Sequence, residues 1–177
     1  MFATKSLDLG SGVKPKNPFN ATEVYGIDIR EEVPNAIFKA DLAIDAIPFS
    51  SESFDYVTAF DFLEHIPRLL YNPKRNHPFV NLMNEIYRIL RVSESGGLFY
   101  SKTPCYPFGD AWRDPTHVNI ISDETFPLYF DNKNRWASMY GFVGAFEVVE
   151  QKINGHHLEA LLKKVPENVI LSKTIYD

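Results

Sequence analysis

The sequence is poor in features that place a protein outside the cytoplasm or against nucleic acid. It has one cysteine, Cys105, which excludes a disulfide framework. No apolar run approaches the ~18–20 residues that a membrane-spanning helix needs, and the first residues lack the pattern of a signal peptide. Acidic residues outnumber basic ones by 23 to 18, and the net charge of -5 disfavours a nucleic-acid groove. We therefore expect a cytoplasmic protein with no membrane span and without nucleic acid as a partner.

The composition is that of an ordinary globular protein. Hydrophobic residues make up 45% and charged residues 23% of the 177 residues, which suits one core and leaves little room for a second. We predict a single domain over residues 1–177. Phe and Tyr are frequent, with 14 and 9 copies, which suggests a packed core together with aromatic surface for a ligand.

The first half of the chain alternates short apolar runs with loops and helical patterns. This alternation is typical of a mostly parallel sheet. The expected strands cover residues 6–9, 24–29, 36–41, 54–60 and 98–103. Residues 79–91 have apolar side chains at helical spacing, and a short helix is expected between Ser122 and Phe130.

The last part of the chain contains a strong turn signal at Asn154-Gly155. It joins residues 146–153 to residues 156–164 and predicts a hairpin, although the second segment also suits a helix. The fold class that follows is α/β, a three-layer Rossmann-like sandwich. Its mostly parallel sheet has about seven strands and ends in a C-terminal antiparallel hairpin.

A glycine turn follows the first strand in Leu7-Asp8-Leu9-Gly10-Ser11-Gly12. Closely spaced glycines let a ligand approach the backbone, and Asp28 at the end of the next strand can accept hydrogen bonds from both hydroxyls of a ribose. Taken alone, the glycines are also consistent with a plain tight turn, and Asp28 with a solvated strand end. Lys14 and Pro15 stand where the dinucleotide fingerprint has its third glycine, so a pyrophosphate suits this turn poorly.

Asp41 ends the third expected strand, so it joins Asp8, Asp28 and the glycine turn at one edge of the sheet. Three acids and a glycine turn suit a ligand with a ribose, an amine and a cationic centre. The order of these motifs, across residues 5–130, resembles that of the class I S-adenosylmethionine-dependent methyltransferases, in particular small single-domain members of the type 11 kind. The segments that carry the resemblance are residues 7–12, 25–28, 39–42, 47–49, 53–57, 62–66, 84–91 and 96–97.

The resemblance implies S-adenosylmethionine as the methyl donor. The glycine turn would lie against its methionine part, Asp8 or Asp61 would receive its ammonium group, and Asp28 would hold the ribose. Asp41 and Leu42 would meet the adenine, whereas His65 is either a catalytic group or a structural donor. The expected cofactor-binding residues are Asp8, Gly10, Ser11, Gly12, Asp28, Ile29, Asp41, Leu42, Phe60, Asp61 and His65.

The acceptor side is expected in residues 103–119, after the fifth strand. Here His117 could act as general base, because an unperturbed histidine titrates near neutral pH, and Asp114 could orient it or bind the acceptor. A capped turn over residues 114–117 is the alternative interpretation. Asp110, Asp114 and His117 could also be metal ligands, but three such groups often share a loop by chance, and we predict no metal.

The chain also has a basic loop after the fourth expected strand and differs from the family in two respects. Arg68, Lys74, Arg75 and His77 could recognise a phosphate or carboxylate, or form a solvated loop. Between Gly12 and Tyr25 the prolines allow no more than a turn or two of helix, which weakens the expected grip on the cofactor's carboxylate. Few residues precede the first strand, so we expect an open site or a lid from a partner chain, which a homo-oligomer could provide.

The sequence is consistent with three functions. The leading one is methyl transfer to an unidentified small molecule, or to a sugar- or lipid-linked acceptor, by in-line displacement. The second is an NAD(P)-dependent oxidoreductase, weakened by the missing third glycine. The third is a non-catalytic relative that binds the nucleoside, which would not need His117 and Asp114 beside an open methyl path.

Overall fold

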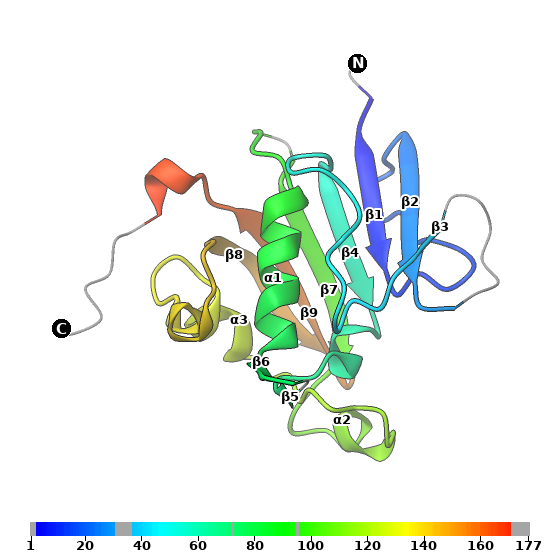
Figure 1. Cartoon of the computed structure of the whole chain (residues 1–177), viewed down its shortest axis with the longest axis vertical. Coiled ribbons are helices and arrows are strands. Elements are labelled where there is room, and N and C mark those ends of the chain that lie inside the picture. Colours follow the sequence, from blue (N-terminus) through cyan, green and yellow to red (C-terminus); the bar gives the residue numbers. More distant parts are fainter. Residues whose placement is uncertain (1–2, 31–36, 72, 95, 171–177) are drawn as a thin grey trace.

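A seven-stranded sheet forms the centre of the computed structural model, which describes residues 3–30, 37–71, 73–94 and 96–170 (Figure 1). In spatial order its strands are β3 (Ile37–Lys39), β2 (Glu23–Asp28), β1 (Lys5–Leu9), β4 (Tyr56–Phe60), β7 (Leu98–Pro104), β9 (His157–Lys164) and β8 (Phe146–Asn154).

The pairing of the strands matches the sequence prediction. β3, β2, β1, β4 and β7 run parallel, whereas β9 is antiparallel to both β7 and β8. β8 and β9 are joined through Gly155, whose φ of 61° is the left-handed conformation that glycine adopts easily. The mostly parallel sheet with a C-terminal antiparallel hairpin is thus confirmed. The first residue of the expected third strand, Ala36, lies outside the described residues.

One face of the sheet is covered by α1 (Pro78–Ile89), which lies across its middle (Figure 1). The helix starts at a proline, which is well placed in a first turn because its missing N–H would be unpaired there in any case. Apolar residues at helical spacing bury one side of it against the sheet. The side chains that meet in this core include Leu7, Val57, Phe79, Leu82, Met83, Ile86 and Phe99.

Two short helices extend this layer beyond α1. They are α3 (Thr125–Tyr129) and the 3-10 helix η2 (Trp136–Tyr140). Contacts between aromatic rings pack this part of the chain against α1. The rings of Phe79 and Phe130, for example, are 5.5 Å apart and nearly perpendicular. Both helices expected from the sequence, in residues 79–91 and between residues 122 and 130, are therefore present.

The remaining elements are short, and they connect or cap the larger ones. They are η1 (Leu63–His65), the β5 (Leu70–Tyr71) and β6 (Arg75–Asn76) pair, α2 (Asp110–Arg113) and η3 (Glu167–Val169). Across the described part of the chain, no helix is both long enough and apolar enough to span a membrane.

The other face of the sheet has a thin cover made by residues 13–22, here called the proline segment. Its Phe19 ring stacks on Tyr56 of β4 with 4.5 Å between centroids, and the Lys16 ammonium lies 4.2 Å from the centre of the Phe60 ring. The proline segment is not helical, as its prolines predict. The third layer of the sandwich is therefore a strap over β1, β2 and β4.

The strand order changes direction at β1. From β1 the chain moves outward to β2 and β3, then returns to β4 on the opposite side of β1. In open α/β sheets, ligands bind at such a switch point, beyond the carboxyl ends of the strands. The carboxyl ends of β1, β2 and β4, here called the open edge, are therefore where a ligand site is expected.

Candidate active site

The glycine turn stands at the open edge directly after β1. Gly10 and Gly12 have φ values of 64° and 60°, and Ser11 donates its backbone N–H to the carbonyl of Ile27 at 3.0 Å. A Cβ at Gly10 would overlap the ring of Phe62, and one at Gly12 would lie 3.3 Å from the Arg30 guanidinium. Both glycines are thus required by conformation and by close neighbours.

Asp28 ends β2 beside this turn, and its carboxylate is buried. Its Oδ2 accepts the Gly12 N–H at 2.8 Å, while Oδ1 accepts both the backbone N–H and the Nε–H of Arg30 at 3.0 Å. The Arg30 side chain is 62% exposed and can leave. Because each carboxylate oxygen offers two acceptor sites, Asp28 fits a pair of ribose hydroxyls once Arg30 moves. Ile29, between them, is largely exposed.

The two acids considered for the ammonium group have different surroundings. Asp8 is buried, accepting the Thr58 hydroxyl at 2.6 Å and the Lys16 N–H at 2.8 Å, and burial raises the pKa of this carboxyl above its ordinary value. It holds the proline segment to the sheet. Asp61 is exposed at φ 49°, with Oδ1 3.0 Å from His157 Nε2. Of the two, Asp61 has the carboxylate that a ligand can reach.

Three further expected residues have mixed positions. Asp41 accepts the Ala43 N–H at 3.0 Å and so caps the turn after β3, and Leu42 is buried beside it. The Phe60 ring lies on the strap side of the sheet, 5.4 Å from the Tyr100 ring. Asp41 and Leu42 are therefore near the open edge, whereas Phe60 packs beneath Lys16.

The acceptor side brings together Glu64, His65 and His117, here called the histidine cluster. One carboxylate oxygen and one nitrogen of each ring lie within 4.8 Å of one another, and the two rings are 5.0 Å apart at 78°. η1 supplies the first two residues. The loop before α3 supplies the third, held by the N–H groups of Val118 and Asn119, which both donate to the Glu64 carbonyl at 2.9 and 3.0 Å.

Glu64 is the most buried member of the histidine cluster. Its Oε2 accepts the Thr103 hydroxyl at 2.6 Å, and its Oε1 is buried without a hydrogen-bond partner. Burial raises the pKa of the Glu64 carboxyl. His117 has a similar orphan, because its Nδ1 is buried and unpartnered while its Nε2 lies 4.0 Å from Asp114 Oδ2.

Asp114 performs the turn-capping role that was one of its two interpretations. It accepts the backbone N–H of Thr116 at 2.8 Å and the Thr116 hydroxyl at 2.7 Å, and these bonds lower the pKa of its carboxyl. Asp110 instead pairs with Arg113 at 3.0 Å and His156 at 3.1 Å. The trio of Asp110, Asp114 and His117 is therefore not assembled, and Glu64 and His65 join His117 in its place.

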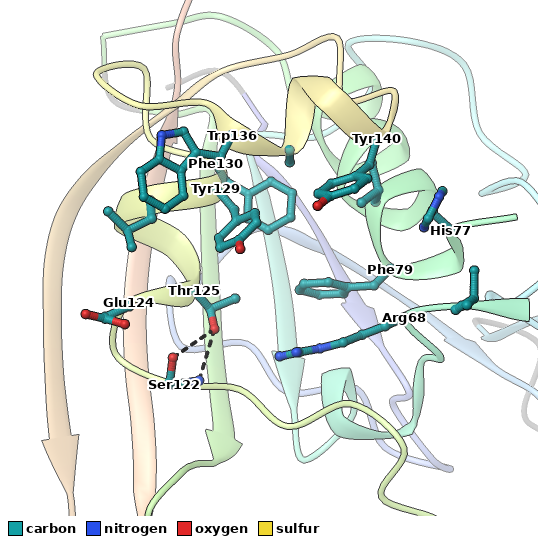
Figure 2. A pocket seen from close by; sticks show the side chains of 14 residues that line it. Arg68, His77, Phe79, Ser122, Glu124, Thr125, Tyr129, Phe130, Trp136 and Tyr140 are labelled. Carbon is teal, nitrogen blue, oxygen red and sulfur yellow. Dashed lines mark hydrogen bonds between the residues drawn. The ribbon is translucent and has the colours of Figure 1, made fainter.

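A pocket of about 540 Å³ lies between α1, α3 and η2 (Figure 2). Its wall is aromatic, with Phe79, Tyr129, Trp136 and Tyr140, and Arg68 extends along one side of it. We call it the aromatic pocket. Arg68 and His77 of the expected basic loop line it, whereas Lys74 and Arg75 are not among its lining residues.

Comparison with known proteins identifies the chain. A family described as a methyltransferase domain matches residues 7–100, more than half of the sequence. The chain belongs to this methyltransferase family. A search of curated proteins finds no match.

Solved structures show where the methyltransferase fold recurs. An S-adenosylmethionine-dependent methyltransferase from Aquifex aeolicus has a TM-score of 0.56 and 15% identity, with 93% of this chain and 83% of that chain covered. A chain of the complex between the Haloferax volcanii Trm112 methyltransferase activator and a methyltransferase has a TM-score of 0.58 and 13% identity, covering 91% and 82%.

A third similar structure contains the product of the methyl donor. The Haemonchus contortus phosphoethanolamine N-methyltransferase 1, in complex with phosphoethanolamine and S-adenosylhomocysteine, has a TM-score of 0.56 and 15% identity. The match covers 92% of this chain but only 39% of that one. Family and fold together indicate a class I methyltransferase with S-adenosylmethionine as methyl donor, and they do not support the oxidoreductase interpretation.

Sequence reasoning missed several residues of the methyltransferase site. Glu64 was recognised only as part of a family segment, and Thr103 was not singled out, although a Glu-His pair after a strand end is a visible signal. Arg30 and Phe62 were also missed. Their roles come from how each side chain folds back over the glycine turn, for which the sequence holds no pattern.

Proposed function

We propose that this methyltransferase transfers a methyl group to an oxygen or nitrogen of a small molecule, or of a sugar- or lipid-linked acceptor, by in-line displacement. When bound, S-adenosylmethionine supplies a methyl group already activated on a sulfonium cation, so no covalent enzyme intermediate is needed. The observation that carries the proposal is the common location of the glycine turn with Asp28 and of the histidine cluster at the open edge of one sheet.

On the cofactor side, backbone and carboxylates of this chain do the binding. We assign the ribose hydroxyls to Asp28, after Arg30 has moved off its Oδ1, and the ammonium group to Asp61 rather than to the buried Asp8. The backbone of the glycine turn lies against the methionine part, since a side chain at Gly10 or Gly12 would fill that space. Asp41 and Leu42 form the adenine end, with Ile29, Ser11 and Phe60 as the remaining expected contacts.

On the acceptor side, the histidine cluster and Asp114 handle the acceptor's proton. His117 Nε2 lies 4.0 Å from Asp114 Oδ2. Asp114 accepts the Thr116 hydroxyl, and this hydroxyl lies 3.1 Å from His65 Nδ1, so Thr116 connects Asp114 to His65. A fixed network of this kind holds ring orientations constant while a proton moves. His117 with Asp114 is therefore our candidate for activating the acceptor.

The aromatic pocket is the proposed place for the body of the acceptor. Arg68 donates from Nε to Asn119 Oδ1 at 2.7 Å, and the Asn119 N–H donates to the Glu64 carbonyl at 3.0 Å. One wall of the pocket is thus tied to the histidine cluster by two consecutive hydrogen bonds. Aromatic walls with a few polar groups are the usual lining of small-molecule sites, and they favour an acceptor with an apolar or sugar-like face.

A partner chain fits the exposed strap side of the sheet. Tyr100 and Leu161 lie there and are only partly buried, beyond the reach of the proline segment. The Haloferax methyltransferase chain is found with an activator. We propose that a second copy of this chain covers the exposed strap side and completes the site, so the mass measured by light scattering should exceed that of a monomer.

The acceptor class can be tested with a labelled methyl group. The protein is incubated with S-adenosylmethionine carrying an isotopic methyl label and a cell extract separated into small-molecule, lipid, nucleic-acid and protein fractions. We expect label in the first or second fraction, lost in a His117→Gln, Asp114→Asn double variant and kept in His156→Gln, which changes an exposed histidine. Label confined to nucleic acid or protein would overturn the proposed acceptor class.

A further inference from the structure

The histidine cluster has unused binding capacity in a buried place. Glu64 Oε1 and His117 Nδ1 are both buried and have no hydrogen-bond partner. Glu64 is 1% exposed and the His117 side chain 9% exposed, so solvent does not satisfy them. An unpartnered buried acceptor costs about 1–3 kcal/mol, and two of them in one cluster point to a ligand that accepts electron pairs.

The surrounding hydrogen bonds leave one electron pair on each residue facing no partner. His65 Nδ1 lies 3.3 Å from the Thr116 carbonyl, which can only accept, so this nitrogen carries the proton and Nε2 is unprotonated. His117 Nε2 lies 4.0 Å from Asp114 Oδ2, beyond hydrogen-bond distance, and the charge of that carboxylate favours the proton on Nε2 and an electron pair on Nδ1. Glu64 offers Oε1, since Oε2 is taken by Thr103.

These supporting contacts follow the pattern found around metal ligands. A histidine that binds a metal usually donates its other ring N–H to a carbonyl or carboxylate, which fixes the tautomer and the ring orientation. His65 has the Thr116 carbonyl for this purpose. His117 has a carboxylate nearby, Asp114 Oδ2 at 4.0 Å from Nε2, which a small side-chain rotation would bring within hydrogen-bond distance.

We propose that Glu64, His65 and His117 bind one divalent transition-metal ion, for which zinc is the best match. Two imidazoles and one carboxylate are a ligand set of catalytic zinc sites, which keep a fourth position open. Ligand atoms of one zinc ion stand at most about 4.2 Å apart. Since one candidate ligand atom of each residue already lies within 4.8 Å of the others, small side-chain rotations close the set. Magnesium and calcium prefer oxygen ligands and fit two imidazoles poorly.

From the sequence alone, His117 groups with Asp110 and Asp114 of its own loop, and these three residues do not predict a metal site. Glu64 and His65 are more than fifty residues away in the chain, and the β4 and β7 strand ends bring them beside it. The open fourth position would take water or an oxygen of the acceptor, which the ion would polarise. That role rests on the proposed methyl transfer, whereas binding of the ion does not.

Metal binding can be measured without any activity assay. Untagged protein is treated with a chelator, dialysed and titrated with Co²⁺, whose visible absorption becomes intense in a tetrahedral protein site, and Zn²⁺ is then added as competitor. We expect one Co²⁺ per chain, displaced by Zn²⁺. His65→Gln and His117→Gln should weaken binding at least tenfold, and His156→Gln, a histidine paired with Asp110 outside the cluster, should bind as wild type.

Two results would overturn the site. One is the absence of tetrahedral Co²⁺ absorption in wild type, and the other is binding that all three variants retain or lose alike. Circular dichroism of the metal-free variants shows whether each one folds. S-adenosylhomocysteine is titrated into the same chelator-treated protein, so that loss of the metal site with intact nucleoside binding removes this inference and leaves the proposed function standing.

Discussion

Arg30 donates from Nε to Asp28 Oδ1 at 3.0 Å and so lies over the carboxylate that ends β2. The same guanidinium is the nearest group to the space above Gly12. Under the proposed function, Asp28 therefore has two competing partners: Arg30 when the site is empty and the ribose when the nucleoside is bound. The Arg30 end of this contact is 62% exposed although the carboxylate is buried, so water can replace the guanidinium and exchange between the two partners costs little.

Removing Arg30 should strengthen nucleoside binding. Exposed ion pairs are worth about 0.2–1 kcal/mol, so Arg30→Ala should tighten S-adenosylhomocysteine binding by up to about fivefold in a calorimetric titration. Arg113→Ala is the matched control, because Arg113 also pairs with an acid, Asp110, at 3.0 Å. Weaker binding in Arg30→Ala would mean that Arg30 contacts the ligand instead of competing with it.

Gly10→Ala should destabilise the fold more than Gly155→Ala. Both positions have positive φ, 64° and 61°, so each alanine costs about 1–2 kcal/mol in backbone strain. The new Cβ at Gly155 meets nothing within 4 Å, whereas at Gly10 it overlaps the Phe62 ring, which adds about 1–3 kcal/mol. Urea denaturation measures both free energies of unfolding, and equal losses would show that Phe62 does not pack there.

Asp8→Asn should change how stability depends on pH. Burial raises the pKa of Asp8 in the folded state above its unfolded value. The stability this group contributes is therefore present below the unfolded pKa and is lost as pH rises through the folded pKa. Asparagine can still accept the Lys16 N–H and donate to the Thr58 oxygen. The melting temperature of the variant relative to wild type should rise between acidic and neutral pH, and a fall over that interval would contradict the account.

Thr103→Val should weaken the support of Glu64 while keeping the side-chain shape. It removes the hydrogen bond that the Thr103 hydroxyl donates to the buried Glu64 carboxylate, so the metal-free protein should lose about 1–3 kcal/mol of unfolding free energy. Ser101→Ala, on the same strand, removes a buried hydroxyl that has no partner and should stay within about 1 kcal/mol of wild type. Similar losses of unfolding free energy in both variants would show that the Thr103–Glu64 hydrogen bond does not stabilise the fold.

The parts predicted from sequence share one property, namely that local patterns determine them. The Asn154-Gly155 turn, the apolar spacing of α1 and the glycine turn after β1 each need only neighbouring residues. The failure of the proline segment to form a full helix is of the same kind, because proline fixes its own backbone. These features sufficed to predict the mostly parallel sheet, its C-terminal hairpin and the edge where the glycine turn and the acids meet.

The parts that escaped prediction depend on contacts between distant segments. Asp8 lies near a strand end, like the other acids expected to bind the cofactor. Only the fold shows that its carboxylate accepts the Lys16 N–H instead. Phe60 alternates to the strap side because of the register of β4 with β7. The pairing of Glu64 with His117 depends on two backbone bonds across more than fifty residues. A single sequence carries no pattern for such encounters.

Calorimetric titration of S-adenosylhomocysteine tests most directly that Asp28 and the glycine turn form the nucleoside site. We expect saturable binding to one site per chain, weakened about 10- to 100-fold in Asp28→Asn, because hydrogen bonds to a charged group are worth about 1.5–3 kcal/mol. Asp123→Asn, an exposed acid before α3, should bind as wild type. Undiminished binding in a folded Asp28→Asn variant, or binding of NAD in place of S-adenosylhomocysteine, would contradict it.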